Sequence, residues 1–135
     1  MNYTLPLSSV MTTDPVTVNR EQKLIDVKHI YEKQKFHHHI PVIDDEGKPV
    51  GLIDMAAFIR ALGSASLDES EKVYNATTVG DIMSAQPVIC DPHTTIKVAA
   101  EEFCKNRADA ILVVKDSKLA GIVTPLDLVK LIAGH

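Results

Sequence analysis

The spacing of apolar residues predicts two amphipathic helices in the first half of the chain. Residues 23–35 carry apolar side chains three or four positions apart, with Lys, Glu and Gln between them: Leu24, Val27, Ile30 and Tyr31. Residues 54–62 repeat this spacing with Met55, Phe58, Ile59 and Leu62. Positions three or four residues apart share one face of a helix, so each segment can cover a hydrophobic layer.

Short β-branched runs predict the strands under these helices. Residues 16–18 (Val-Thr-Val) predict a short strand after the turn signal Asp14-Pro15. Residues 40–43 (Ile-Pro-Val-Ile) predict a buried strand, and residues 50–53 predict the strand that returns beside it. The polar segment 44–48 between them has the composition of a hairpin turn.

The second half of the chain repeats this order at nearly constant spacing. The corresponding positions are Met11 and Met83, Pro15 and Pro87, Gly51 and Gly121, the helix faces around Val27 and Ala99, and the strands at 40–43 and 111–114. The pattern predicts a first repeat with its N-terminal lead-in at 1–62, a small, polar and acidic linker at 63–77, and a second repeat at 78–135. A unit of ~55 residues is marginal alone, so the repeats are expected to share a core or an interface.

Composition and charge exclude several classes of protein. Of the 135 residues, 45% are hydrophobic but only 4% are aromatic, so Val, Ile, Leu and Ala must build the core. The net charge of −4 and the lack of a Lys/Arg run argue against nucleic-acid binding. No signal peptide or apolar run of ~20 residues is found, so a soluble, cytoplasmic protein is expected. Cys90 and Cys104 fit no C-x-x-C pattern and are expected to be reduced.

Residues 121–127 (Gly-Ile-Val-Thr-Pro-Leu-Asp) support two interpretations. In the structural one, a strand ends at Val123, Thr124 caps a helix, Pro125 is its first residue, and Asp127 completes a capping box. In the functional one, the Thr124 hydroxyl and the Asp127 carboxylate converge on one spot. A carboxylate can accept hydrogen bonds from two vicinal hydroxyls, as a ribose requires. The segment alone does not decide between them.

The repeated motifs resemble the cystathionine-β-synthase (CBS) domain pair, also called a Bateman module. In the first half they are residues 10–12, 15–18, 39–44 with Gly47, and 51–53; in the second half they are 82–84, 87–88 and 121–127. Each motif alone is weak, but two copies in register cover nearly the whole chain. The resemblance implies an α/β (α+β) fold of tandem CBS repeats, each strand–helix–strand–strand–helix, packed as a pseudo-twofold pair with two clefts.

In many members of this family a cleft between the repeats holds AMP, ADP, ATP or S-adenosylmethionine. The family's ribose motif is Gly, two apolar residues, Thr or Ser, two further residues and Asp, and Thr124 and Asp127 match it. The first repeat has Asp54 and Ala57 at the corresponding positions. Ala57 cannot accept a hydrogen bond and Asp54 would disfavour phosphate, so one cleft is expected to bind and the other to be degenerate.

The resemblance also implies which residues line the base. They are Thr12, Thr13, Pro15, Val16, His37, His38, His39 and Pro41. An imidazole can stack on a purine or, when protonated, pair with phosphate. The three histidines also suggest a metal site, but alternate residues of a strand share a face, so only His37 and His39 could act together. Two ligands do not complete a zinc site, and a third from Asp54 is speculative.

These observations favour a regulatory module over an enzyme. No nucleophile with a recognisable base is found, so we expect no catalysis and no metal or other cofactor. The favoured function is sensing of an adenosine ligand and signalling to a regulated partner protein; the alternative is a ligand-free dimerisation module. Apolar residues left over on the helices, Phe58, Ile59, Val129 and Ile132, predict a homodimer formed through the helical layer.

Overall fold

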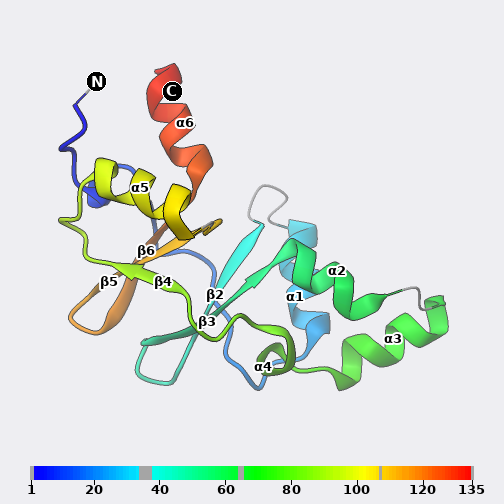
Figure 1. Cartoon of the computed structure of the whole chain (residues 1–135). Coiled ribbons are helices and arrows are strands. Elements are labelled where there is room, and N and C mark those ends of the chain that lie inside the picture. Colours follow the sequence, from blue (N-terminus) through cyan, green and yellow to red (C-terminus); the bar gives the residue numbers. More distant parts are fainter. Residues whose placement is uncertain (1, 34–37, 64–65, 107, 135) are drawn as a thin grey trace. The chain divides into compact units, whose positions relative to one another are not determined.

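The computed structural model describes residues 2–33, 38–63, 66–106 and 108–134, and it divides into two compact units (Figure 1). The first unit contains residues 1–15, 47–49 and 87–135, and the second contains residues 16–46 and 50–86. Each unit therefore combines a lead-in segment from one repeat with the strands and helices of the other. The mixed α/β class predicted from the sequence is confirmed.

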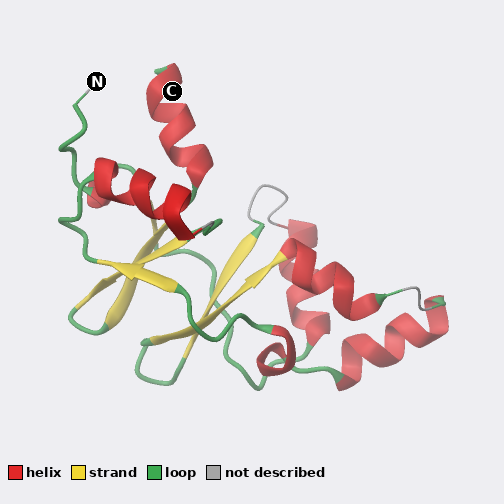
Figure 2. Ribbon diagram, in the orientation of Figure 1, coloured by secondary structure: helices red, strands yellow, loops and turns green. Residues whose placement is uncertain are grey.

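The first unit is a four-stranded sheet with two helices on one face (Figure 2). The strand order is β1 (Thr12–Thr13), β6 (Lys118–Val123), β5 (Ile111–Lys115) and β4 (Val88–Cys90). Helices α5 (Ile96–Asn106) and α6 (Pro125–Ala133) and the short helix η1 (Leu7–Ser9) complete this unit. Its buried core consists of Leu7, Ile96, Ala99, Ile111, Val113 and Val123. The predicted helix face and strands of the second repeat are thus confirmed.

The second unit contains the two-stranded sheet of β2 (His39–Ile43) and β3 (Pro49–Asp54). Its helices are α1 (Leu24–Lys33), α2 (Met55–Leu62), α3 (Leu67–Ala76) and α4 (Val79–Ile82). The buried core is Val18, Leu24, Val27, Ile40, Val42, Ile53, Phe58 and Val79. Phe58 contacts Tyr31 edge-on and stacks on Tyr74, so an aromatic cluster joins three helices. The predicted helices are confirmed, except that residues 34 and 35 lie outside the described part.

The strand predicted at residues 16–18 is wrong. Only Val18 pairs with β2, through a single parallel bridge to Val42. In the second repeat the corresponding β4 forms three parallel pairs with β5, including Val88 with Ile111. Extension of this ladder to residues 16 and 17 would need the backbone N–H of Pro41, which proline lacks. The proline in the motif therefore shortens this ladder.

The segment predicted as a linker, residues 63–77, contains helix α3, which the sequence analysis did not assign. The Ser66 side chain accepts from the Glu69 N–H, and the Glu69 carboxylate accepts from the Ser66 N–H, forming a capping box. Val73 and Tyr74 pack against the core of the second unit. The small, acidic composition of this segment did not indicate a helix, because only a few of the side chains of α3 face the core.

No described helix is both long and apolar enough to cross a bilayer.

A methionine and a glycine dock the lead-in segment in each unit. A Cβ at Gly121 would lie 2.5 Å from Met11 Sδ, and a Cβ at Gly51 would lie 2.6 Å from Met83 Sδ. Each thioether therefore fills the space that a side chain at the glycine would need. The repeated Met and Gly positions of the sequence therefore have a packing role. In each unit the methionine of a lead-in segment packs against the glycine of a strand that is distant in sequence.

Candidate functional site

The start of α6 brings Thr124 and Asp127 together. Strand β6 ends at Val123, Thr124 has the extended backbone of a helix cap, and Pro125 is the first helical residue. The Asp127 carboxylate accepts the Thr124 N–H at 2.8 Å and the Thr124 hydroxyl at 3.3 Å. The Asp127 N–H donates to the Thr124 carbonyl oxygen at 3.0 Å. The cap predicted from the sequence is confirmed.

The geometry leaves part of this pair available to a ligand. Both hydrogen bonds to the carboxylate fall on Oδ2, and within the described chain Oδ1 of Asp127 has no hydrogen-bond partner. Thr124 and Asp127 are half-buried, so both remain reachable from solvent. An ionised carboxylate with a free oxygen can accept hydrogen bonds from vicinal hydroxyls. The structural and functional interpretations therefore use different oxygens and are compatible.

Strand β1 lies beside the strand that leads into this pair. Thr12 is opposite Ile122 and Thr13 is opposite Gly121 in the antiparallel register. Asp14, with φ of 50°, then has a left-handed backbone that turns the chain towards Pro15. The structure therefore places Thr12, Thr13 and Pro15 in the same unit as Thr124 and Asp127.

The remaining residues predicted to line a base belong to the second unit or are not described. Val16, His38, His39 and Pro41 lie in the second unit, and His37 lies outside the described residues. Val16 and His38 are exposed, His39 is half-buried in β2, and Pro41 is buried. No group of three or more metal-ligating side chains occurs in the described part of the chain. The role of the predicted base-lining residues in ligand binding stays a prediction.

The start of α2, which corresponds to the start of α6, has the reverse arrangement. Asp54 occupies the cap position, and its Oδ1 accepts the Ala57 N–H at 2.7 Å. Ala57 stands where the second repeat has Asp127.

Burial and the nearby Asp54 carboxylate raise the pKa of Tyr31 well above its usual range. Its phenol therefore stays protonated and donates to the His38 carbonyl oxygen at 3.1 Å.

The capping box at the start of α4 shows how much of the site is ordinary helix chemistry. At the start of α4 the Asp81 carboxylate accepts the Thr78 N–H at 2.9 Å. Hydrogen bonds from the Thr78 backbone and side chain lower the pKa of Asp81. The residue pattern Thr-x-x-Asp is therefore shared by a helix start without the preceding Gly and two apolar residues. This pair offers a matched control for Thr124 and Asp127.

A groove that the sequence analysis did not find lies between α5 and α6 in the first unit. Its volume is about 600 Å³, and its walls include Ile96, Ala100, Cys104, Leu128, Leu131 and Ile132. Ile132 was recognised in the sequence as a leftover apolar residue. For Leu128 and Leu131 the signal in the sequence was that residues 125–133 carry only two charged side chains, Asp127 and Lys130.

Comparisons with known proteins agree with the repeats. The CBS domain model matches residues 7–64 and 79–134. The uncharacterized protein MJ1426 of Methanocaldococcus jannaschii is 28% identical, over 86% of this chain and 84% of its own length. Inosine-5′-monophosphate dehydrogenase of Bifidobacterium longum is 34% identical over 90% of this chain, which spans only 21% of that enzyme.

The fold is similar to a solved CBS domain pair. The crystal structure of the CBS domain pair of protein MJ0100, in complex with 5′-methylthioadenosine and S-adenosyl-L-methionine, gives a TM-score of 0.81. The match covers 96% of this chain and 97% of that chain, with 23% sequence identity. The predicted tandem fold is confirmed.

Proposed function

The chain belongs to the CBS domain family, and on this basis we propose that it is a regulatory module that senses an adenosine-containing ligand. The ligand class comprises AMP, ADP, ATP and S-adenosylmethionine, which share the ribose and the purine. The observation that carries the proposal is the Thr124–Asp127 pair at the start of α6, where one carboxylate oxygen remains free. The complex of the MJ0100 domain pair with two adenosine compounds supports this ligand class.

In the proposed complex the ribose hydroxyls donate to Oδ1 of Asp127 while Oδ2 continues to hold the helix start. The Thr124 hydroxyl adds a lone pair towards the same ligand. Thr12, Thr13 and Pro15, in the same unit, are the first candidates for contacts with the base. Val16, His37, His38, His39 and Pro41 are also included in the proposal, and substitution of each tests its contribution.

Binding is proposed to regulate another protein and not to support catalysis. The chain matches a dehydrogenase only over 21% of that enzyme's length, so the match gives no ground to assign its activity. The state of the ligand site would be signalled to a partner through the surfaces of the module. We also propose that the chain self-associates through its helices, because Ile59, Val129 and Ile132 are more than half exposed. Phe58, which was also predicted to be left over for this surface, is instead buried in the core of the second unit.

A thermal-shift screen tests the proposed ligand class. AMP, ADP, ATP, S-adenosylmethionine and divalent metal ions are added separately, and calorimetry then measures the affinity of each compound that stabilises the fold. A ligand that binds only the folded state raises stability by RT ln(1 + [L]/Kd), or ~2.7 kcal/mol at 100 times Kd. We expect at least one adenosine compound to raise the melting temperature. No response to any of them would favour the ligand-free interaction module.

A further inference from the structure

Strand β1 is a small element that few contacts hold in place. It has two residues, Thr12 and Thr13, and lies at the edge of its sheet beside β6. Most strands are longer, so the ladder between β1 and β6 is short. The side chain of Met11, directly before β1, packs against Gly121 of β6, which lies opposite Thr13. This packing is therefore a large part of what holds β1 beside β6.

The contact between Met11 and Gly121 leaves no room for a further atom on the glycine side of the sulfur. A Cβ at Gly121 would lie 2.5 Å from Met11 Sδ, 2.9 Å from Met11 Cγ and 2.8 Å from the Thr12 carbonyl oxygen. The glycine is buried, whereas Met11 is half-buried and can be reached from solvent. The sulfur thus combines close packing on one side with access for a small oxidant.

Oxidation of this thioether would change both its size and its polarity. The sulfur donates an electron pair to one oxygen of hydrogen peroxide, the O–O bond breaks, an S–O bond forms, and the second oxygen leaves as water with the two protons of the peroxide. The methionine sulfoxide that results is polar and accepts hydrogen bonds. The polar atom beside the same point of the glycine, the Thr12 carbonyl oxygen, is also an acceptor and cannot pair with it. The sulfoxide would therefore fit poorly against Gly121.

We propose that Met11 is an oxidative modification site, and that its sulfoxide releases β1 from β6 and lowers the affinity of the chain for its adenosine ligand. Strand β1 carries Thr12 and Thr13, which are proposed to contact the base, and β6 leads into Thr124. The modification is reversible, because methionine sulfoxide reductases restore the thioether at the expense of a thiol reductant. The effect on affinity rests on the proposed function, whereas the release of β1 does not.

Met83 provides a matched control within the same chain. It is also half-buried, and it packs against Gly51 in the second unit. The strand that contains Gly51, β3, leads into Asp54 and Ala57, which lack the ribose pattern. Oxidation of Met83 should therefore lower stability as oxidation of Met11 does, but have little effect on the affinity for the ligand.

Two proteins that each keep one of these methionines separate the effects. One keeps Met11 and carries Met55→Leu/Met83→Leu, and the other keeps Met83 and carries Met11→Leu/Met55→Leu. Leucine replaces methionine at little cost in a core and is not oxidised by peroxide. Each protein is treated with hydrogen peroxide until peptide mass spectrometry shows one added oxygen at the methionine that it keeps.

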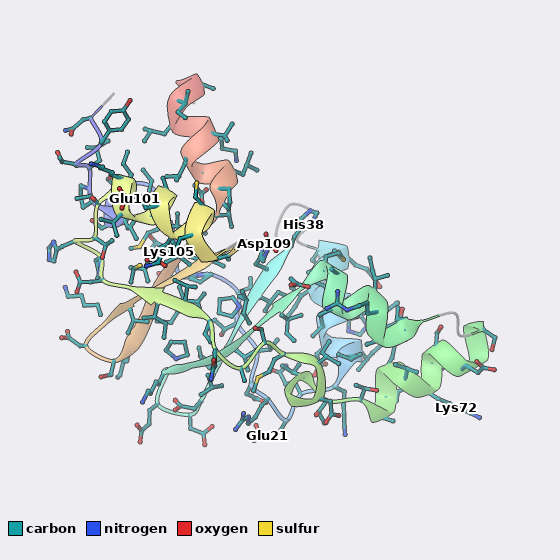
Figure 3. All side chains as sticks on the ribbon, in the orientation of Figure 1. Glu21, His38, Lys72, Glu101, Lys105 and Asp109 are labelled. Carbon is teal, nitrogen blue, oxygen red and sulfur yellow. The ribbon has the colours of Figure 1, made fainter. Side chains whose placement is uncertain are left out.

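Both proteins also carry Cys90→Ser and Cys104→Ser, so that no thiol is oxidised. Cys104 is exposed, on the part of α5 that carries Glu101 and Lys105 (Figure 3), and peroxide would otherwise reach it.

We expect oxidation to lower the melting temperature of both proteins by about 4 °C. Calorimetry with AMP and with S-adenosylmethionine should show binding weakened about tenfold by oxidation in the protein that keeps Met11, and by less than about twofold in the other. Amide hydrogen exchange of residues 10–13 should accelerate only when Met11 is oxidised. Treatment with the reductases should reverse each change. The same exchange measurement on the oxidised parent chain does not depend on the leucine substitutions.

Three results would overturn the proposal: unchanged exchange of residues 10–13 after oxidation of Met11, equal loss of affinity in the two proteins, or faster exchange without loss of affinity. A parent chain that binds neither compound before oxidation would instead count against the proposed function. Faster exchange of residues 10–13 in that chain after oxidation would still support the release of β1.

Discussion

Asp127 accepts both the backbone N–H and the hydroxyl of Thr124 on one carboxylate oxygen, Oδ2. This arrangement fixes the start of α6 and orients the carboxylate, so that Oδ1 points to no protein donor in the described chain. The corresponding carboxylate of the first repeat, Asp54, is instead the cap and accepts the Ala57 N–H. The equivalent helices α2 and α6 therefore carry the carboxylate at different positions: at the cap in α2 and at the third helical residue in α6. Only α6 combines the Thr-x-x-Asp pattern with a carboxylate oxygen that accepts no hydrogen bond from the described chain.

Asp127→Ala is predicted to weaken binding of the adenosine ligand at least about tenfold in a protein that remains folded. Hydrogen bonds to a charged group contribute ~1.5–3 kcal/mol each, and ~1.4 kcal/mol corresponds to a factor of ten. The melting temperature without ligand should also fall, because a first-turn carboxylate stabilises its helix by ~0.3–1 kcal/mol. Calorimetry gives the affinity and a thermal scan gives the stability.

Asp81→Ala separates the two effects, because it removes the same type of capping bond at the start of α4. This control should lower the melting temperature and leave the affinity for the ligand unchanged. Unchanged affinity in Asp127→Ala would refute the assignment of the ribose contact.

The sequence predicted the elements of the fold better than their assembly. Helices α1, α2 and α5 were found because their apolar residues follow the helical period, and α6 because Thr124, Pro125 and Asp127 are the signals of a helix start. The hairpin strands were found because short apolar runs flank polar turns. The exchange of lead-in segments was not found, because β1 has two residues and pairs with a strand more than a hundred positions away. No local pattern records such a pairing. The sequence shows that Pro41 has no backbone N–H. Its effect on strand pairing depends on which segment lies beside β2, and the sequence does not show that segment.

The candidate site was likewise predicted from the sequence only where its contacts are local. Thr124 and Asp127 are three residues apart on a helix start, so local rules of capping predicted their contact. The residues proposed to line a base are far apart in sequence and came only from the resemblance to a family. Thr12, Thr13 and Pro15 share a unit with Thr124 and Asp127, and the role of all the predicted base-lining residues stays a prediction. The groove between α5 and α6 depends on how two helices pack, which periodicity alone does not give.

Gly121→Ala is predicted to destabilise the protein by about 1–3 kcal/mol, because the new methyl group would overlap the Met11 thioether. The cost should be smaller in a Met11→Ala background, although the Thr12 carbonyl oxygen, 2.8 Å from the new Cβ, prevents full recovery. Denaturant unfolding of the four proteins in this cycle measures the coupling.

Gly51→Ala, next to Met83, provides a crossed control for this coupling. Its cost should be reduced by Met83→Ala and not by Met11→Ala. Equal costs of Gly121→Ala with and without Met11 would contradict the docking role of that methionine.

Cys104 is predicted to react with iodoacetamide faster than Cys90 at pH 8. Burial raises the pKa of the Cys90 thiol, and the Glu102 carboxylate raises it further, so less reactive thiolate is present at this pH. Cys104 is exposed. The difference between the labelling rates of the two thiols should narrow as the pH rises. Glu102→Gln should accelerate the labelling of Cys90. Mass spectrometry of quenched samples follows each site, and faster labelling of Cys90 in the native protein would contradict the prediction.

The parent chain is predicted to bind one phosphate-bearing nucleotide per chain, because the start of α2 lacks the ribose pattern. Ala57→Asp restores the carboxylate, but Asp54 remains at the cap and should repel phosphate, so this single variant should still bind one. Asp54→Thr with Ala57→Asp recreates the Thr-x-x-Asp pattern and keeps a residue that caps helices well, so a second site should appear. Calorimetric stoichiometry distinguishes the three proteins. Two equivalent sites in the parent, or one site in a folded double variant, would show that the difference between Asp54 and Asp127 does not determine which repeat binds the ligand.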